Sequence, residues 1–206
     1  MAEQPTTQID PFVAPPAWEI AYLFPSQGDW SEEEFLALNT NRLVELSDGR
    51  LEVLPLPTEQ HQTILLFIYE VVRQFVVPGK LGKVLIAPLR VRLWKGKIRE
   101  PDLVFMLAAN KRRRTNRIWQ GADLVMEVVS EDDPDRDLRI KRREYAKAGI
   151  AEYWVIDPRH ETITVLALEK GKTRYTVKGT YARGQEAVSV LLRGLKVSVE
   201  QAFSQE

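Results

Sequence analysis

The segment 122–158 constrains this chain most, because its apolar run Leu124–Val129 contains a single carboxylate, Glu127. A short run that is apolar on both faces, 122–129, predicts a strand in the interior of a sheet. An uncompensated charge in such a strand costs several kcal/mol. The fold must therefore place a cation or hydrogen-bond donors beside Glu127.

A helix expected downstream can supply the cation. Pro134 suits its first turn, and Gly149 suits its C-terminal stop. Within it, Asp137, Lys141 and Tyr145 follow one another at spacings of four residues and share one face. Lys141 lies on the apolar, inward side, where it either reaches Glu127 or covers apolar surface while keeping its ammonium in water.

A second acid opens another apolar run. Glu100-Pro101-Asp102 precedes 103–107, so Asp102 is expected at the start of a strand. Asp102 and Glu127 can meet if their strands are neighbours. Two acids on strands and a helical lysine suggest a site for a divalent metal and a phosphodiester. The carbonyl of Val128 could supply a further oxygen ligand to the metal. The alternative is a structural pair of acids satisfied by backbone amides or arginines.

The remaining pattern divides the chain into a proline-rich tail or strap, residues 1–29, and one domain, residues 30–206. Ser31 to Glu34 is a capping-box pattern that predicts a short helix. The other elements expected are strands 42–47 and 50–55 around Asp48-Gly49, a helix 59–77, strands 84–93 and 98–107, a polar loop 108–121, strands 152–157 and 162–168, and edge strands with a short terminal helix after residue 174.

Composition excludes several classes of site and partner. The 206 residues contain no Cys, which excludes disulfides, thiolate-bound zinc and thiol nucleophiles. They contain only two His. Lys and Arg total 29, as do Asp and Glu, so net charge does not indicate a polyanionic partner. No apolar run is long enough to span a bilayer, and the N-terminus does not read as a signal peptide. We expect a cytoplasmic protein without membrane contact.

Three motifs in the sequence resemble those of a known protein family. Pro101-Asp102 followed by Glu127 on an apolar strand resembles the PD-(D/E)XK nuclease superfamily, although Val129 stands where the usual lysine would be. The spacing Glu127 to Lys141, followed by Glu152-Tyr-Trp-Val-Ile-Asp-Pro158, resembles the Uma-type putative restriction endonucleases, in which the lysine lies on the following helix. Glu45-Leu-Ser-Asp-Gly-Arg50 and His61-Gln62 also match that group.

The resemblance implies an α/β (α+β) restriction endonuclease-like fold, a mixed β-sheet flanked by helices, often in homodimers. It implies an endonuclease dependent on Mg²⁺ or Mn²⁺ that hydrolyses nucleic acid, with DNA as the expected substrate. Asp102, Glu127 and Val128 would bind the metal, Lys141 would orient or activate the water, and Glu45 would assist. A catalytically silent nucleic-acid-binding or protein-interaction module on the same fold is the alternative, and a structural homo-oligomer is a third hypothesis.

Several residues keep two interpretations. Glu45 is either a third acid next to the metal or a solvent-facing hairpin residue. His61 either positions a phosphate or water, or is a capping or surface residue, and we leave it out of the predicted catalytic set. Tyr145 is more typical of a core. The basic run Lys111–Arg114, with Arg117, either grips a nucleic-acid backbone or is a solvated loop.

Overall fold

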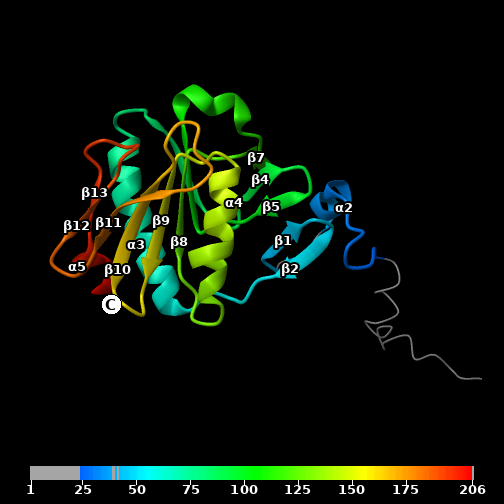
Figure 1. Cartoon of the computed structure of the whole chain (residues 1–206), viewed down its shortest axis with the longest axis horizontal. Coiled ribbons are helices and arrows are strands. Elements are labelled where there is room, and N and C mark those ends of the chain that lie inside the picture. Colours follow the sequence, from blue (N-terminus) through cyan, green and yellow to red (C-terminus); the bar gives the residue numbers. More distant parts are fainter. Residues whose placement is uncertain (1–23, 39, 41, 206) are drawn as a thin grey trace, which may run out of the picture.

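Two large β-sheets form the framework of the computed structural model, which describes residues 24–38, 40 and 42–205. Nearly all of the predicted tail, residues 1–29, lies outside the described residues, so its role stays a prediction. The first sheet has six strands in the order β11 (Thr176–Tyr181), β10 (Thr162–Ala167), β9 (Glu152–Asp157), β8 (Leu124–Val128), β6 (Leu103–Leu107) and β3 (Gly82–Ile86) (Figure 1). The second has five, in the order β2 (Arg50–Val53), β1 (Val44–Ser47), β5 (Lys97–Arg99), β4 (Arg90–Trp94) and β7 (Ile118–Gln120).

Helices and a third, two-stranded sheet complete the described fold. The two-stranded sheet pairs β12 (Glu186–Val188) with β13 (Lys196–Ser198). The helical elements are α2 (Glu32–Ala37), α3 (Glu59–Val76), the 3₁₀ helix η1 (Ala108–Arg113), the π-helix η2 (Arg136–Lys141), α4 (Arg142–Lys147) and α5 (Val199–Phe203). This is the mixed sheet flanked by helices that the sequence predicts.

The six-stranded sheet is mixed because β8 and β9 run parallel while its other neighbours are antiparallel. A parallel pair cannot be joined by a tight turn and needs a crossover connection. In this chain the crossover is η2 followed by α4, which lies across β8 and β9 (Figure 1). The connection that the topology requires is therefore the element that carries Lys141.

Alternation along β8 separates the two faces of this sheet. Leu124, Met126 and Val128 belong to the core cluster that includes the apolar face of α3. Val125 belongs to the opposite cluster, which includes Tyr145 of α4. Glu127 has the same parity as Val125, so its side chain projects toward α4 rather than α3.

Two predicted strands are wrong in the same way. The stretches 84–93 and 98–107 each form two strands, β3 and β4 in the first case and β5 and β6 in the second. Pro88 and Pro101 lie at the two breaks, and proline has no N–H to donate to a β-ladder. The halves join different sheets, since β3 pairs with β6 and β4 pairs with β5.

Other local predictions hold or need correction. The hairpin β1–β2 and the capping box at Ser31 are present as predicted. Thr58 caps α3 by accepting a hydrogen bond from the backbone N–H of His61, which fixes His61 in the first turn. The predicted polar loop 108–121 contains η1 and β7, and the helix predicted after Pro134 begins as a π-helix. Within the described residues, no helix has the length and apolarity needed to cross a membrane.

Candidate active site

Two acids lie side by side where β6 and β8 pair. The antiparallel register joins Leu103 to Met126, which places the preceding Asp102 opposite Glu127. The backbone N–H of Asp102 donates to Glu127 Oε2 at 3.3 Å, and the backbone N–H of Val128 donates to Asp102 Oδ2 at 2.8 Å. The strands are neighbours, as the sequence analysis requires, and both acids are held by backbone amides.

Lys141 reaches the acids from η2. Its Nζ lies 3.1 Å from Glu127 Oε1 and 3.0 Å from Asp137 Oδ1, and the Lys141 side chain is almost completely buried. Tyr145 donates its hydroxyl to the same Glu127 oxygen at 2.5 Å. The face predicted for 137, 141 and 145 therefore points at Glu127. Short π-helical segments are frequent at functional sites, and η2 ends at Lys141.

His61 also belongs to this cluster, although the sequence analysis leaves it out of the catalytic set. Its Nε2 lies 3.1 Å from Asp102 Oδ2, and its Nδ1 is buried without a hydrogen-bond partner among the described residues. Asp137 and Tyr145 are the other contacting residues outside that set. The i, i+4 spacing could have identified these two, whereas only the match to the family's helix start points to His61.

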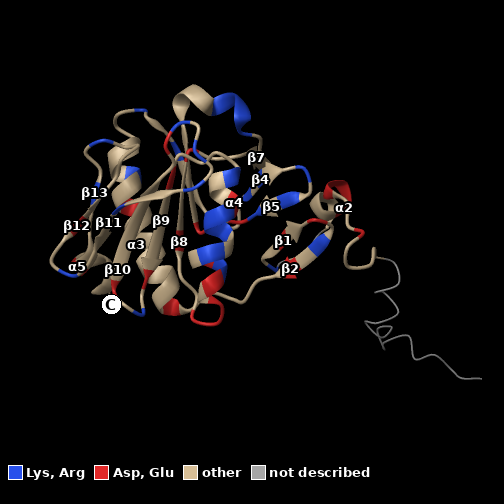
Figure 2. Ribbon diagram, in the orientation of Figure 1, with Lys and Arg blue, Asp and Glu red and all other residues tan. Residues whose placement is uncertain are grey.

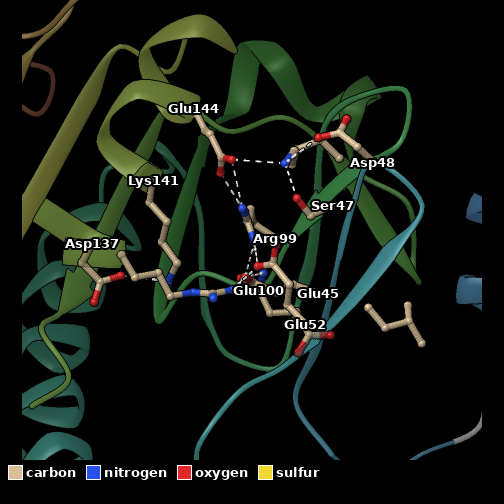
Figure 3. Close-up of polar contacts among 12 residues, drawn as sticks. Glu45, Ser47, Asp48, Glu52, Arg99, Glu100, Asp137, Lys141 and Glu144 are labelled. Atoms are coloured by element: carbon tan, nitrogen blue, oxygen red, sulfur yellow. Dashed lines mark hydrogen bonds and ion pairs between the residues drawn. The ribbon is translucent and has the colours of Figure 1, made fainter. Parts of the chain in front are cut away.

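Of the two positions predicted for Glu45, burial excludes one, and the other, a third acid next to the metal, stays a prediction. Glu45 is fully buried on β1, so the solvent-facing alternative is wrong. Its carboxylate is 2.7 Å from Arg99 Nη1, pairs with Arg136, and accepts the backbone N–H of Glu100 at 2.9 Å (Figure 3). Burial opposes ionisation, but the cations of Lys141, Arg99 and Arg136 outweigh it and lower the pKa of Glu45 to about 2. The carboxylate is thus ionised and neutralised by arginines.

The cluster around Lys141 contains more carboxylates than cations. Burial raises the pKa of Glu127 well above its ordinary value; the ammonium of Lys141 opposes this, and the charges of Asp102 and Asp137 add to it. Burial alone would lower the pKa of Lys141, but the surrounding carboxylates, Glu127 first, raise it well above its ordinary value. Lys141 is therefore an ammonium, and the site favours one more positive charge.

The donor set fits a hard, hydrated divalent cation. Mg²⁺ accepts one or two carboxylates, keeps several waters and prefers oxygen ligands. Asp102 and Glu127 offer two carboxyl groups in one place, in a cluster where three acids, these two and Asp137, surround the single ammonium of Lys141. Among the described residues, no group of three or more His, Asp or Glu is placed to share one ion.

The basic run lies at the other end of β6. η1 begins directly after the last residue of β6, whereas Asp102 directly precedes the first residue of β6. About five residues of strand, roughly 17 Å, therefore separate η1 from Asp102. Figure 2 shows Lys and Arg on this helical turn, beyond the end of the large sheet. Arg113 donates Nε to the carbonyl of Gln120 at 2.7 Å. A phosphate held by this run would not be the phosphate at the acids.

Comparisons with known proteins show the fold and the family of this chain. A crystal structure described as a putative nuclease belonging to DUF820, from Anabaena variabilis ATCC 29413, superposes with a TM-score of 0.69 and 20% identity, covering 85% of this chain and 98% of that one. At this identity the likeness shows the fold. None of the curated proteins matches the chain significantly. The family model described as Uma2, "Putative restriction endonuclease", matches residues 32–200. The chain belongs to the Uma2 family of putative restriction endonucleases.

Proposed function

We propose that the protein is an endonuclease dependent on Mg²⁺ or Mn²⁺ that hydrolyses phosphodiester bonds in nucleic acid, with DNA as the main substrate. Family membership supports nuclease function in general. The observation that carries the finer proposal is the contact set of Asp102, Glu127 and Lys141, in which Lys141 Nζ lies 3.1 Å from Glu127 beside a second acid. The proposed metal dependence is supported by the number of acids that meet in this buried cluster.

The protein's own groups have separable tasks. Asp102, Glu127 and the carbonyl of Val128 would hold the metal, which when bound polarises a phosphoryl oxygen and acidifies a water. Lys141, kept protonated by its carboxylates, would hold the attacking water and stabilise negative charge developing on the phosphate. The ion pair between Lys141 and Glu127 would also fix the orientation of the Glu127 carboxylate.

Neighbouring residues position these groups. Tyr145 holds Glu127 by its hydroxyl, and His61 holds Asp102 by Nε2. Glu45 would assist indirectly by positioning η2: it binds Arg136 at the start of η2, and η2 presents Lys141. None of these three needs to contact the substrate for this role.

A cleavage assay tests the proposal. Plasmid, single-stranded DNA and RNA are incubated with Mg²⁺, Mn²⁺ or EDTA, and products are separated on gels. We expect cleavage with either metal, none in EDTA, and none by Glu127→Gln. The control is Glu169→Gln, which changes a half-exposed carboxylate that pairs with Lys178 and should cleave like wild type. Absence of cleavage by the wild type with both metals would contradict the proposal.

Glu127→Gln also tests metal binding without activity. Because burial and neighbouring acids disfavour its charge, the variant should melt no lower than wild type in EDTA. Wild type should gain about 2.7 kcal/mol from Mn²⁺ at 100 times its dissociation constant, and the variant should lose this gain. A loss of roughly 3 kcal/mol in EDTA would instead make Glu127 chiefly a structural partner of Lys141.

One observation favours the catalytically silent alternative. Lys141 already pairs with both Glu127 and Asp137, so the cluster could be a closed structural network on a binding module. That alternative predicts nucleic-acid binding or protein interaction, with neither cleavage nor stabilisation by Mn²⁺. The two measurements above therefore separate it from the enzyme.

We also propose that the active species is a homodimer, as the family resemblance implies. Sedimentation equilibrium of the full chain measures this directly. A monomer at the concentration used in the cleavage assay would contradict the dimer and leave the proposed chemistry intact.

A further inference from the structure

A cavity of about 470 Å³ leads to the acids, and its outer wall is apolar. The wall is built by the segment Leu54–Pro57, which joins β2 to α3, and by Leu65 and Leu66 of α3. Asp102, Glu127 and Lys141 line the same cavity. Its volume falls in the range of small-ligand pockets, so it can admit a group the size of a nucleotide.

The charged residues that line this cavity are mostly acids. The carboxylates are Glu100, Asp102, Glu127, Glu131, Asp132 and Asp137, and the cations are Arg136 and Lys141. Both cations are already engaged, because Lys141 pairs with Glu127 and Asp137 while Arg136 pairs with Glu45 and Glu52. A metal ion would offset part of this charge at the acids but not at the exposed rim of the cavity, formed by Glu131 and Asp132.

An intact duplex suits this entrance poorly. Double-stranded DNA carries one negative charge per roughly 1.7 Å of axis, and proteins that bind it neutralise many phosphates with Lys and Arg. With a scissile phosphate at Asp102, the flanking phosphates of a duplex would face Glu131 and Asp132. The basic run of η1 lies at the far end of β6, and Arg139, Arg142 and Arg143 do not line the cavity.

An unpaired nucleotide suits the same entrance well. Leu56 is 71% exposed and Leu66 is 48% exposed, so the wall offers apolar surface that a base can cover. Enzymes that act on extruded bases hold them between apolar or aromatic side chains and read their polar edges. His61 Nδ1, Glu100 Oε2 and Arg136 Nε are buried without hydrogen-bond partners among the described residues, and all three residues line this cavity.

We infer that the substrate enters as an unpaired nucleotide, with its base against the Leu54–Pro57 and Leu66 wall and its phosphate at the acids. The enzyme therefore cleaves single-stranded nucleic acid and looped-out or frayed strands in preference to intact duplex. This inference rests on the proposed nuclease function and adds its substrate class. A single strand can turn its remaining phosphates away from the acidic rim, which a stiff duplex cannot do.

The test uses one labelled oligonucleotide in three forms: single strand, complete duplex, and duplex with a central unpaired bubble. With Mn²⁺, we expect kcat/KM for the single strand to exceed that for the duplex at least about tenfold, a difference within the range that one base contact supplies. Cuts in the bubble substrate should map to the bubble. Equal kcat/KM for single strand and duplex would overturn the inference and leave the proposed function standing.

Wall variants test the placement of the base. Leu56→Ser and Leu66→Ser should each lower kcat/KM for the single strand several-fold while leaving the stabilisation by Mn²⁺ unchanged. The matched control is Val77→Ser, which removes a 51%-exposed apolar side chain at the opposite end of α3. Unchanged kcat/KM in both Leu variants would overturn the assignment of this wall.

A binding measurement decides the matter even without turnover. Fluorescence anisotropy in Ca²⁺ compares the affinity of the full chain for the single strand and the duplex. Tighter binding of the single strand, weakened in Leu56→Ser, supports the inference even if no form is cleaved, in which case the proposed function alone fails. Equal or tighter binding of the duplex overturns the inference.

Discussion

Lys141 shows how far the surroundings of one residue can depart from those of an ordinary lysine. Its side chain is 6% exposed and its ammonium pairs with two carboxylates. An alanine at this position would leave these acids buried and unpaired, which typically costs about 3 to 5 kcal/mol. The stem of Lys141 also packs, so methionine is the better substitution because it keeps the packing and removes only the charge.

We predict that Lys141→Met abolishes cleavage but keeps, or increases, the stabilisation by Mn²⁺, because lysine is not a metal ligand. Cleavage rate and melting temperature with Mn²⁺ or EDTA measure the two effects. Lys147→Met is the control, since Lys147 is exposed on α4 and stacks over Trp94. Lys141→Arg should rescue poorly because a planar guanidinium does not fit a site shaped for an ammonium. Wild-type cleavage by Lys141→Met would remove Lys141 from the mechanism.

At the scale of elements, Arg99 ties the five-stranded sheet to the helical crossover. From β5 its Nε and Nη2 bind Glu144 of α4 at 2.8 and 2.9 Å, and its Nη1 lies 2.7 Å from Glu45 and 2.6 Å from Glu52 (Figure 3). Glu144 follows Lys141 by three residues, so the bidentate contact sets the rotation of the helix that presents Lys141.

We predict that Arg99→Lys lowers the free energy of unfolding by about 3 kcal/mol, because an ammonium cannot bind Glu144 through two nitrogens and reach Glu45 as well. Urea unfolding measures this change. The control is Arg183→Lys, since Arg183 likewise pairs with more than one carboxylate, Glu161 and Glu200, but at an exposed site. That control should lose far less, because exposed ion pairs contribute little to stability. Equal losses in the two variants would show that the buried network adds no stability.

At the scale of the whole molecule, acid should unfold the protein partly through Asp157. Burial opposes its ionisation, but hydrogen bonds from Arg159 and His160 lower the pKa of Asp157 to about 2. A carboxylate with a lowered pKa adds stability above its unfolded-state pKa, and this stability disappears as pH falls through the folded-state value. The loss therefore falls between about pH 4 and pH 2. Glu127 acts in the opposite direction because its pKa is raised.

We predict that Asp157→Asn is less stable than wild type at pH 7 by about 1 to 2 kcal/mol, and that the difference vanishes near pH 2. Urea unfolding of both proteins at a series of pH values measures the difference. Contributions of the other acids to the free energy of unfolding cancel in this difference, because both proteins contain those acids. A difference that stays constant from pH 7 to pH 2 would show that the contacts of Asp157 do not depend on its charge.

Local patterns in the sequence were enough to predict part of this molecule. The hairpin at Asp48-Gly49, the length of α3, the buried strand β8 and the shared face of 137, 141 and 145 all appear as expected. Each depends on residues within one turn, strand or helix, where turn chemistry, capping and the periods of helix and strand decide the outcome. The contact of Lys141 with Glu127 followed because a buried carboxylate needs a partner.

Other features were decided only by the tertiary structure. His61 contacts Asp102, 41 positions away in the sequence, and Glu45 contacts Arg99, 54 positions away. No pattern within one helix or strand can predict contacts at these separations. Pro88 and Pro101 interrupt the β-ladders, but a missing N–H does not specify that the halves of each run join different sheets. Strand pairing depends on register and packing between distant segments, and shifting a strand by one residue moves every side chain to the other face. The local pattern therefore determined the apolar core of strands such as β8, and only the pairing of the sheets decided that Glu45 is buried and which buried charges meet.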